Sequence, residues 1–282
     1  MNFLQWGRNP WGQQVLQHVS WDLLWASLFA GLMFLVAHAS YMVLSAHRKR
    51  TAAETDALEA ANKDLPERIP RHSFMARMFH WVMAVSMFVL LFTAFLPIVG
   101  VQFAWVTWHW VAGLVLTGSI IYDIIHATFW LDFWSIWVGP KDIPEFKAEM
   151  LRELGHEVEG PKPGKYPLGN RLYHLAIVVA GFAVTITGIL MMQRIRTPLF
   201  ERNPYGTMSD IAWGWTYIAH GLAGVALVGL VIAHVYFAVR PDKWWITKSM
   251  LFGWIPRRLY LEHHDSKRWN VKGGKAQPAS RA

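Results

Sequence analysis

Five long apolar windows dominate the pattern of hydrophobic and polar positions along this chain. Each window holds more than twenty residues with almost no charge, and the segments between them are polar or charged. About 20 apolar residues suffice for an α-helix to cross the hydrocarbon core of a bilayer. The pattern therefore predicts an all-α integral membrane protein with five spans. The windows cover residues 21–44, 76–99, 105–130, 168–192 and 213–238.

The composition agrees with a membrane setting and limits the chemistry. Hydrophobic residues make up 54% of the 282 residues and charged residues 16%, which is typical of a membrane protein. The chain has no cysteine, which excludes thiolate-bound iron–sulfur clusters, covalent haem attachment and disulfides. Any metal must therefore be bound by histidine, methionine or carboxylate side chains.

Lysine and arginine are distributed unevenly between the segments that join the windows. Of the 27 basic residues, 23 fall on the side that holds the C-terminus and four on the side that holds the N-terminus. By the positive-inside rule, the N-terminus lies outside and the C-terminus in the cytoplasm of a bacterial cell. The net charge of +8 is thus a topology signal, and we expect no nucleic-acid partner.

The same pattern divides the chain into segments. The basic residues follow the first apolar window instead of preceding it, so we expect a retained helix and not a signal peptide. The linker after it contains an acidic helical stretch, and the tail after Trp269 is expected to be disordered. The segments are an outer N-terminal segment (1–20), an extra transmembrane helix (21–44), a cytoplasmic linker (45–75), a four-helix core (76–238) and a cytoplasmic tail (239–282).

Two histidines in the last window, His220 and His234, are separated by 14 positions. In an α-helix this spacing corresponds to a rise of about 21 Å and places both side chains on nearly one face. Polar groups at two depths of a bilayer are costly and indicate a functional site. Two haems stacked across the membrane need ligands with this spacing.

The outer half of the membrane holds one further histidine, His109, at the start of the third span. A haem b with two axial ligands needs two imidazoles at matching depth on facing helices. The depth argument therefore pairs His109 with His220.

The inner half is more crowded with histidines. A single intramembrane histidine can also serve packing, by forming a hydrogen bond with a neighbouring helix. That structural interpretation is favoured for three of them, namely His38, His126 and His174. The inner candidates are His38, His80, His126, His174 and His234.

The angular phase argues against one of the inner candidates, His126. His126 lies 17 residues after His109, which turns it about 100° away from the face of His109. His80 follows Arg77, whose guanidinium is suited to a haem propionate. We therefore expect His80 and His234 to form the inner pair.

Three polar residues are candidates for the quinone or proton region. Asp123 is a carboxylate inside a span, and it can serve proton uptake or simply pair with an arginine; both interpretations stay open. Asn170 and His174 lie at the inner end of the fourth span and are candidates for the same region.

Several motifs carry a family resemblance. They are R-x-x-H-W from Arg77 to Trp81, H-x-x-x-G from His109 to Gly113, K-Y at Lys165, HVYFAVRPDKWW from His234, and SMLFGWIPRRLYLEHHDSKRW from Ser249. With these motifs the chain resembles the cytochrome b (gamma) subunit of respiratory formate dehydrogenase, over roughly residues 71–269. This family groups with the cytochrome b subunits of thiosulfate reductase and nickel–iron hydrogenase.

The resemblance implies that four histidines bind two b-type haems as axial ligands of the iron: His80, His109, His220 and His234. It further implies a non-catalytic subunit, which does not itself oxidise formate. Such a subunit passes electrons from a molybdenum or tungsten catalytic subunit, through an iron–sulfur subunit outside the membrane, to a quinone near the cytoplasmic face.

The chain departs from the family in two places. Asn often follows the K-Y motif in the family, whereas Pro167 stands here and Asn170 comes one turn later. The helix over residues 21–44 lies outside the four-helix core, and it is expected to replace a contact made elsewhere by a partner's anchor helix.

Two other functions remain as alternatives. The same electron-transfer role can serve a hydrogenase, a thiosulfate reductase or another molybdenum enzyme. A haem-free transporter or scaffold is the alternative from another class, and the scarcity of intramembrane charge beyond Asp123 argues against it.

Overall fold

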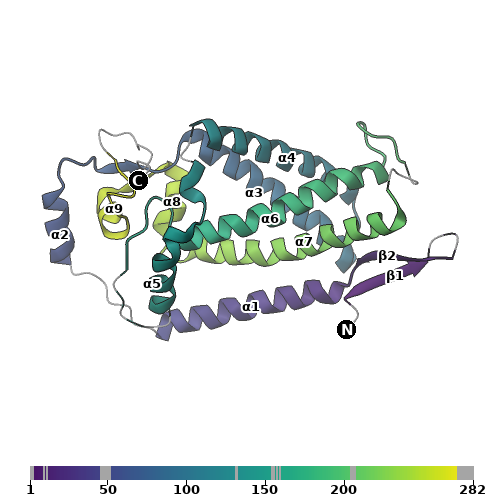
Figure 1. Ribbon diagram of the computed structural model, residues 1–282, viewed down its shortest axis with the longest axis horizontal. Helices are drawn as coiled ribbons and strands as arrows, with labels where there is room; N and C mark the ends of the chain where they lie inside the picture. Colours follow the sequence, from purple (N-terminus) through teal and green to yellow (C-terminus); the bar gives the residue numbers. More distant parts are fainter. Residues whose placement is uncertain are drawn as a thin grey trace. The chain divides into compact units, whose positions relative to one another are not determined.

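The computed structural model is mostly helical (Figure 1). It describes residues 3–8, 10, 12–44, 52–130, 133–153, 156, 158, 160–203 and 208–271. Five of its helices are long and apolar enough to span a membrane, which confirms the fold class expected from the sequence. These helices are α1 (Trp21–Leu44), α3 (Phe74–Phe95), α4 (Trp105–Trp130), α6 (Leu168–Met191) and α7 (Asp210–Val239).

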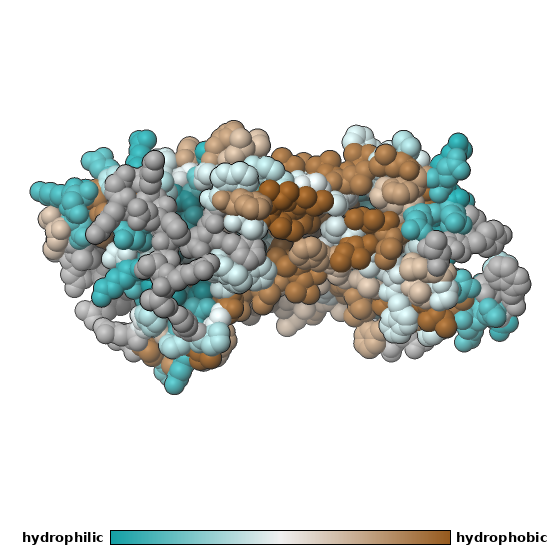
Figure 2. Space-filling view, turned by 45° about the horizontal axis from the view of Figure 1, so that its top comes forward, coloured by the Kyte–Doolittle hydropathy of each residue, from teal (hydrophilic) through white to brown (hydrophobic). Residues whose placement is uncertain are grey.

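The surfaces of these helices are apolar. Figure 2 shows hydrophobic side chains gathered over the long helices. Large apolar side chains such as Phe29, Phe92 and Val179 are mostly exposed, because in the cell their neighbours are lipid chains and not water. The exposure that marks a defect in a water-soluble protein is thus the expected state here.

The chain divides into two compact units, and all five long helices contribute to both. Unit 1 comprises Met1–Ala37, Val82–Ile120 and Ala176–Val235. Unit 2 comprises His38–Trp81, Ile121–Leu175 and Tyr236–Ala282.

In unit 1, a β-hairpin packs on the first half of α7. Its strands are β1 (Leu4–Arg8) and β2 (Gln14–Val19), which pair antiparallel. Leu16 and Val19 of β2 are buried and form a small apolar cluster with Ile218 of α7. The sequence analysis assigned no structure to this segment.

Helix α1 packs along α7 within unit 1. Its Ser27 Oγ donates a hydrogen bond to the Val225 carbonyl at 3.3 Å. A Cβ added at Gly229 would lie 3.5 Å from the same Oγ, an ordinary van der Waals distance, so the contact does not depend on this glycine. The extra helix is therefore attached to the bundle through its own contacts.

Unit 2 contains a small core outside the spans. Strand β3 (Arg68–Pro70) pairs antiparallel with β4 (Trp254–Pro256), and α9 (Arg257–His263) follows directly. The remaining helices of this unit, apart from single 3-10 turns, are α2 (Ala52–Ala61), α5 (Ile143–Glu153) and α8 (Trp244–Phe252). The buried side chains of its core are Ile69, Ile255, Tyr260, Trp269 and Val271.

Gly253, which follows α8, connects the C-terminal tail to the segment that precedes α3. Gly253 ends α8 with φ +86°, a left-handed conformation that favours glycine. Its carbonyl accepts hydrogen bonds from the backbone N–H groups of Arg71 and His72 at 2.8 and 3.0 Å. A Cβ at this position would lie 2.9 Å from the His72 carbonyl, so the junction requires glycine.

The structure tests two expectations for segments outside the spans, one for the linker and one for the tail. The acidic stretch of the linker forms α2, as predicted. The tail is not disordered directly after Trp269, because Val271 is buried in the core of unit 2. Residues 272–282, and residues 45–51 of the linker, lie outside the described residues.

Candidate functional site

His109 of α4 and His220 of α7 face each other inside unit 1. Their ring centres are 6.3 Å apart, and the ring planes are inclined by 66°. Helix α4 begins just before His109, and α7 runs through three turns before His220, so both rings lie near the same end of the unit. The structure thus brings together the two residues that the depth argument had paired.

A threonine on a neighbouring helix holds each of these rings. Thr93 Oγ1 of α3 lies 2.8 Å from His109 Nδ1, and Thr187 Oγ1 of α6 lies 2.9 Å from His220 Nδ1. Each imidazole is therefore fixed through Nδ1, which leaves Nε2 for another partner. Neither threonine was expected from the sequence to belong to the site.

The separation of the two rings fits two imidazoles bound to one metal ion. A metal–imidazole bond is about 2.0–2.1 Å long, and the ring centre lies roughly 1.1 Å behind the nitrogen, so rings on opposite sides of one ion have centres about 6.2–6.4 Å apart. The observed 6.3 Å agrees with this value. Two ligands alone do not complete a coordination shell, and a haem supplies the four equatorial nitrogens.

The structure offers no competing protein-only metal site in the part of the chain that it describes. No three histidine, aspartate or glutamate side chains come together there as ligands. The facing pair on α4 and α7 is suited to axial ligation of a haem and not to a structural or hydrolytic zinc site, which needs three or four protein ligands.

Three other spanning histidines, all in unit 2, contact aromatic rings. His126 stacks on Tyr122 of its own helix at 5.6 Å, and the ring of His174 meets Trp137 edge-on at 5.3 Å. His38 Nδ1 lies 2.9 Å from the Tyr236 hydroxyl, a hydrogen bond between α1 and α7. His38 thus makes the interhelical hydrogen bond that the structural interpretation predicts. The Nδ1 atoms of His126 and His174 are buried with no hydrogen-bond partner among the described residues, so for these two the structural interpretation stays a prediction.

His80 lies in unit 2 among positively charged groups. Burial lowers the pKa of the neighbouring His72 well below its ordinary value, and the charges of Arg71, Lys165, His80 and Arg77 lower it further. His80 and three further basic side chains, Arg71, Arg77 and Lys165, therefore act on one place, at His72. Such a cluster is suited to an anionic group such as a carboxylate.

Arg77, the expected propionate partner, is partly engaged by the chain itself. Its Nη1 donates a hydrogen bond to the Leu251 carbonyl. Its Nε is buried and has no hydrogen-bond partner among the described residues, so one donor remains to be satisfied. His80 belongs to unit 2 and His234 to unit 1, and their pairing stays a prediction.

The quinone and proton candidates lie in unit 2. Asn170 is exposed in the first turn of α6, and Asp123 of α4 is half-buried. Among the described residues, Asp123 has no arginine or lysine within ion-pair distance. The structure does not gather Asp123, Asn170 and His174 through any hydrogen bond between them.

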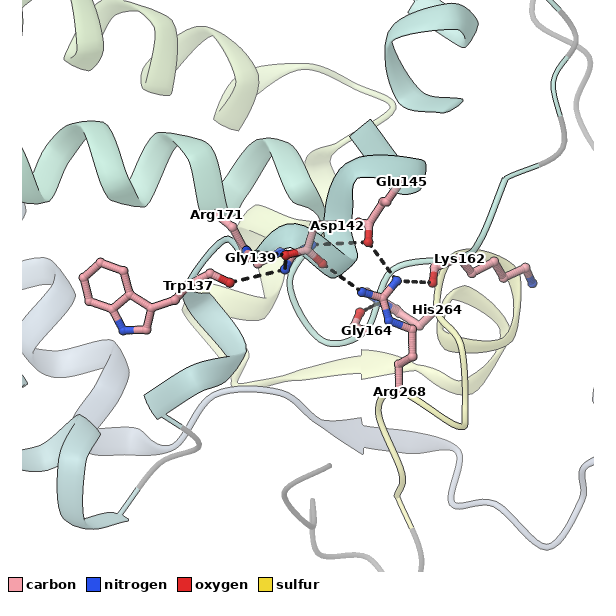
Figure 3. A network of polar contacts seen from close by, with 9 residues as sticks. All are labelled: Trp137, Gly139, Asp142, Glu145, Lys162, Gly164, Arg171, His264 and Arg268. Atoms are coloured by element: carbon pink, nitrogen blue, oxygen red, sulfur yellow. Dashed lines mark hydrogen bonds and ion pairs between the residues drawn. The ribbon is translucent and has the colours of Figure 1, made fainter. Parts of the chain in front are cut away.

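A buried network of ion pairs joins α5, α6 and the tail, and the sequence analysis missed it (Figure 3). Arg171 lies 2.8 Å from Asp142 and 3.2 Å from Glu145. Arg268 lies 2.7 Å from Glu145 and 3.5 Å from Asp142. Two guanidinium groups thus share two carboxylates, which fixes the loop after α4 against the tail.

A second buried contact lies beside this network. Arg71 is 2% exposed, and its Nη1 lies 3.1 Å from His264 Nε2, while His264 Nδ1 lies 2.6 Å from the Gly164 carbonyl. Burial lowers the pKa of Arg71 to about 10, so the guanidinium remains charged at neutral pH. The aromatic faces of Tyr166, Trp245 and Trp269 surround this cation.

A bundle of membrane helices with two facing imidazoles at the spacing of a metal centre defines a membrane protein of the b-type cytochrome class. Comparison with known proteins agrees. The family model described as prokaryotic cytochrome b561 matches residues 71–253, well over half of the chain, so the chain belongs to this family, whose members bind haem b.

Curated relatives narrow the comparison. The formate dehydrogenase cytochrome b556 subunit of Haemophilus influenzae is 24% identical over 220 residues, covering 72% of this chain and 82% of that protein. The formate dehydrogenase cytochrome b556(fdo) subunit of Escherichia coli K12 is 21% identical over 217 residues, covering 72% of this chain and 92% of that protein. The chain is thus a cytochrome b membrane subunit of a respiratory oxidoreductase.

Proposed function

We propose that this chain is the di-haem b subunit that passes electrons from a periplasmic formate dehydrogenase, through its iron–sulfur subunit, across the inner membrane to quinone. The single observation that carries this proposal is the His109–His220 pair, whose ring centres lie 6.3 Å apart on facing membrane helices. When bound, each haem supplies a one-electron redox centre. The role of the chain is to hold and orient these centres.

Two residues of the chain bind the first haem, and two more bind the second. His109 and His220 supply Nε2 to the outer haem because Nδ1 of each ring is held by a threonine. His80 and His234 supply the inner ligands. The 14-residue spacing within α7 supports this assignment, since it places His234 on nearly the same face as His220 and about 21 Å away.

Basic side chains anchor the anionic edge of the inner haem. Arg71, Arg77 and Lys165 all act electrostatically on His72, and so does His80. A propionate accepting a hydrogen bond from the unbonded Nε of Arg77 satisfies that donor. By the positive-inside rule, the same basic groups support a cytoplasmic location for this end of the bundle.

Quinone reduction takes place at the cytoplasmic end, where two electrons and two protons are needed. Asn170 and His174 are the candidates for polar contacts with the quinone, and Asp123 for proton delivery. Asp123 suits this role because it is half-buried and no basic side chain of the described residues neutralises it.

The donor enzyme is the finer part of the proposal. The relatives named above are formate dehydrogenase subunits, and they support formate dehydrogenase over a hydrogenase or a thiosulfate reductase. Affinity purification of the tagged chain from its native membrane tests this choice. A co-purifying formate-oxidising molybdenum or tungsten subunit supports it, and a co-purifying hydrogenase contradicts it.

Haem stoichiometry tests the ligand assignment. Pyridine haemochrome quantification of the purified wild-type protein is expected to give two haems b per chain. Replacing His109 or His220 by Ala is expected to remove the same haem, and replacing His80 or His234 the other. His126→Ala is the matched control, because His126 lies on α4 with His109 and is expected to leave both haems in place.

Two outcomes contradict the proposal. Wild-type protein without haem contradicts it entirely. Retention of both haems after replacement of His109, with loss after replacement of His126, contradicts the pairing while leaving the cytochrome class intact.

A further inference from the structure

The hydroxyl groups of Thr93 and Thr187 are engaged in the same way, on two different helices. Thr93 Oγ1 donates to the Val89 carbonyl at 2.7 Å, four residues earlier in α3. Thr187 Oγ1 donates to the Ala183 carbonyl at 2.5 Å, four residues earlier in α6. Each hydroxyl also contacts the Nδ1 atom of one facing histidine, at 2.8 and 2.9 Å.

The proton count determines the direction of the contacts with histidine. A threonine hydroxyl has a single proton and two acceptor lone pairs. Because that proton is already donated to the carbonyl of its own helix, the hydroxyl can only accept from the imidazole. Nδ1 therefore carries the hydrogen in both rings, and Nε2 carries the lone pair that a metal requires.

We propose that Thr93 and Thr187 are positioning residues that fix the tautomer and the ring orientation of His109 and His220 and tune the redox potential of the outer haem. This inference rests on the proposed ligation of that haem by the two histidines. Outer partners of a ligating imidazole orient its ring and set its basicity. A neutral hydroxyl accepts the Nδ1 proton less strongly than a carboxylate does, and more strongly than an apolar side chain.

Back-bonding by itself does not mark a threonine as functional. Serine and threonine in membrane helices commonly donate to the carbonyl four residues earlier. Thr117 of α4 does so, with its Oγ1 2.8 Å from the Gly113 carbonyl, and in the described part of the chain it bonds to no histidine. The distinguishing feature of Thr93 and Thr187 is the second contact, and Thr117 supplies a matched control.

The test compares isosteric and conservative variants of the full-length, haem-loaded protein. Thr93→Val and Thr187→Val remove the hydroxyl acceptor while keeping the shape, and they leave in place the backbone carbonyls of Leu90 and Val184, which also bond to His109 and His220. Thr93→Ser and Thr187→Ser keep the hydroxyl, and Thr117→Val is the control. Haem content is measured by pyridine haemochrome, midpoint potentials by redox titration, and imidazole orientation by the g-values of the low-spin ferric haem in electron paramagnetic resonance spectra.

Loss of the acceptor weakens the electron donation of the ligand, which favours ferrous iron. For each valine variant we expect the reduced-to-oxidised ratio of one of the two haems to rise about tenfold at a fixed potential, which corresponds to about 59 mV. The g-values of that haem are expected to change as well. The serine variants and Thr117→Val are expected to match the wild type. Loss of the outer haem in a valine variant, with retention in the matching serine variant, also supports the proposal.

Two results overturn it in distinguishable ways. If the wild type binds two haems and His109→Ala loses one, unchanged potentials and g-values in both valine variants refute the role of the threonines alone. Equal effects of the valine and serine variants also refute it, because they indicate a packing role. If the wild type binds no haem, the proposed function fails together with the inference that rests on it.

Discussion

Acidification is predicted to loosen the tail of this protein through one buried histidine, His264. Its Nδ1 lies 2.6 Å from the Gly164 carbonyl, which can only accept, so Nδ1 carries the hydrogen. Its Nε2 lone pair then accepts from Arg71 at 3.1 Å. Burial, followed by the charge of Arg71, lowers the pKa of His264 to about 3, so the ring is neutral wherever the tail is docked.

The sign and the size of the effect follow from this pKa. An exposed histidine has a pKa of about 6.5, so the undocked tail binds a proton below that pH while the docked tail does not. The stabilising contribution is therefore complete above pH 6.5 and is lost progressively as the pH falls toward 3. Between pH 7 and pH 5 the loss amounts to about 2 kcal/mol, set mainly by protonation of the undocked state.

Hydrogen exchange measures this local opening directly. A loss of about 2 kcal/mol lowers the protection factors of the amides in α9, normalised to the intrinsic exchange rate, about 30-fold between pH 7 and pH 5. His264→Gln keeps a polar amide that does not titrate, so its protection factors are expected to depend much less on pH in this range; the dependence that remains is attributed to His72, whose pKa is also lowered by burial. His263→Gln, on the exposed neighbouring position, is expected to keep the pH dependence of the wild type.

The pH dependence of the protection factors in the wild type and in His264→Gln shows whether His264 causes the acid sensitivity. If His264→Gln shows the same drop in protection as the wild type, the acid sensitivity arises from another group and the argument from Arg71 and Gly164 is wrong. If the wild type shows no drop between pH 7 and pH 5, the docked imidazole accepts a proton, and its buried contact with Arg71 does not hold in solution.

Two further predictions concern stability. The side chain of Arg171 is 7% exposed, and replacing it by Met leaves two buried carboxylates with a single cation. We expect the free energy of unfolding to fall by about 3–5 kcal/mol, measured as a lower thermal-unfolding midpoint of the detergent-solubilised protein. Arg268→Met is expected to lower the free energy of unfolding by less than Arg171→Met, because Arg268 is 34% exposed and water can solvate the carboxylates in its place. Equal losses in the two variants contradict this ranking. A Cβ at Gly214 would lie 2.7 Å from Leu16 Cβ. Gly214→Ala is therefore expected to displace the hairpin and to speed hydrogen exchange in β2. Unchanged exchange in β2 would contradict this prediction.

The spans could be predicted from the sequence because their cause is local. The expected windows 21–44 and 105–130 coincide with α1 and α4, and the other three differ by a few residues at their ends. The bilayer imposes the minimum length and apolarity on each helix separately, so no knowledge of the neighbouring helices is needed.

The short elements outside the spans could not be predicted in this way. The strands β3 and β4 have three residues each and exist because Arg68–Pro70 meets Trp254–Pro256 far along the chain. The hairpin at residues 4–19 likewise depends on apolar contacts of Leu16 and Val19 with α7. Periodicity over such short segments carries too little information, and the partner that stabilises them is distant in sequence.

The residues of the candidate site likewise fall into those that the sequence predicts and those that it does not. Spacing and depth sufficed to expect that His109 and His220 face each other. Thr93 and Thr187 were missed because a threonine inside a membrane helix usually satisfies its hydroxyl on its own backbone. Only the positions of α3 against α4 and of α6 against α7 show that these two hydroxyls serve a second partner.

The same structural detail explains why histidine count alone is a poor guide to ligands in this protein. His126 lies on α4 with His109 and at a plausible depth, yet its ring is stacked between Tyr122 at 5.6 Å and Trp130 at 6.1 Å, one turn away on either side. A ring held in this way is oriented by its own helix. The rings of His109 and His220 are instead held by hydroxyls from other helices, and their centres lie 6.3 Å apart. The close approach of two imidazoles from different helices, each held by a threonine hydroxyl, thus distinguishes His109 and His220 from His126.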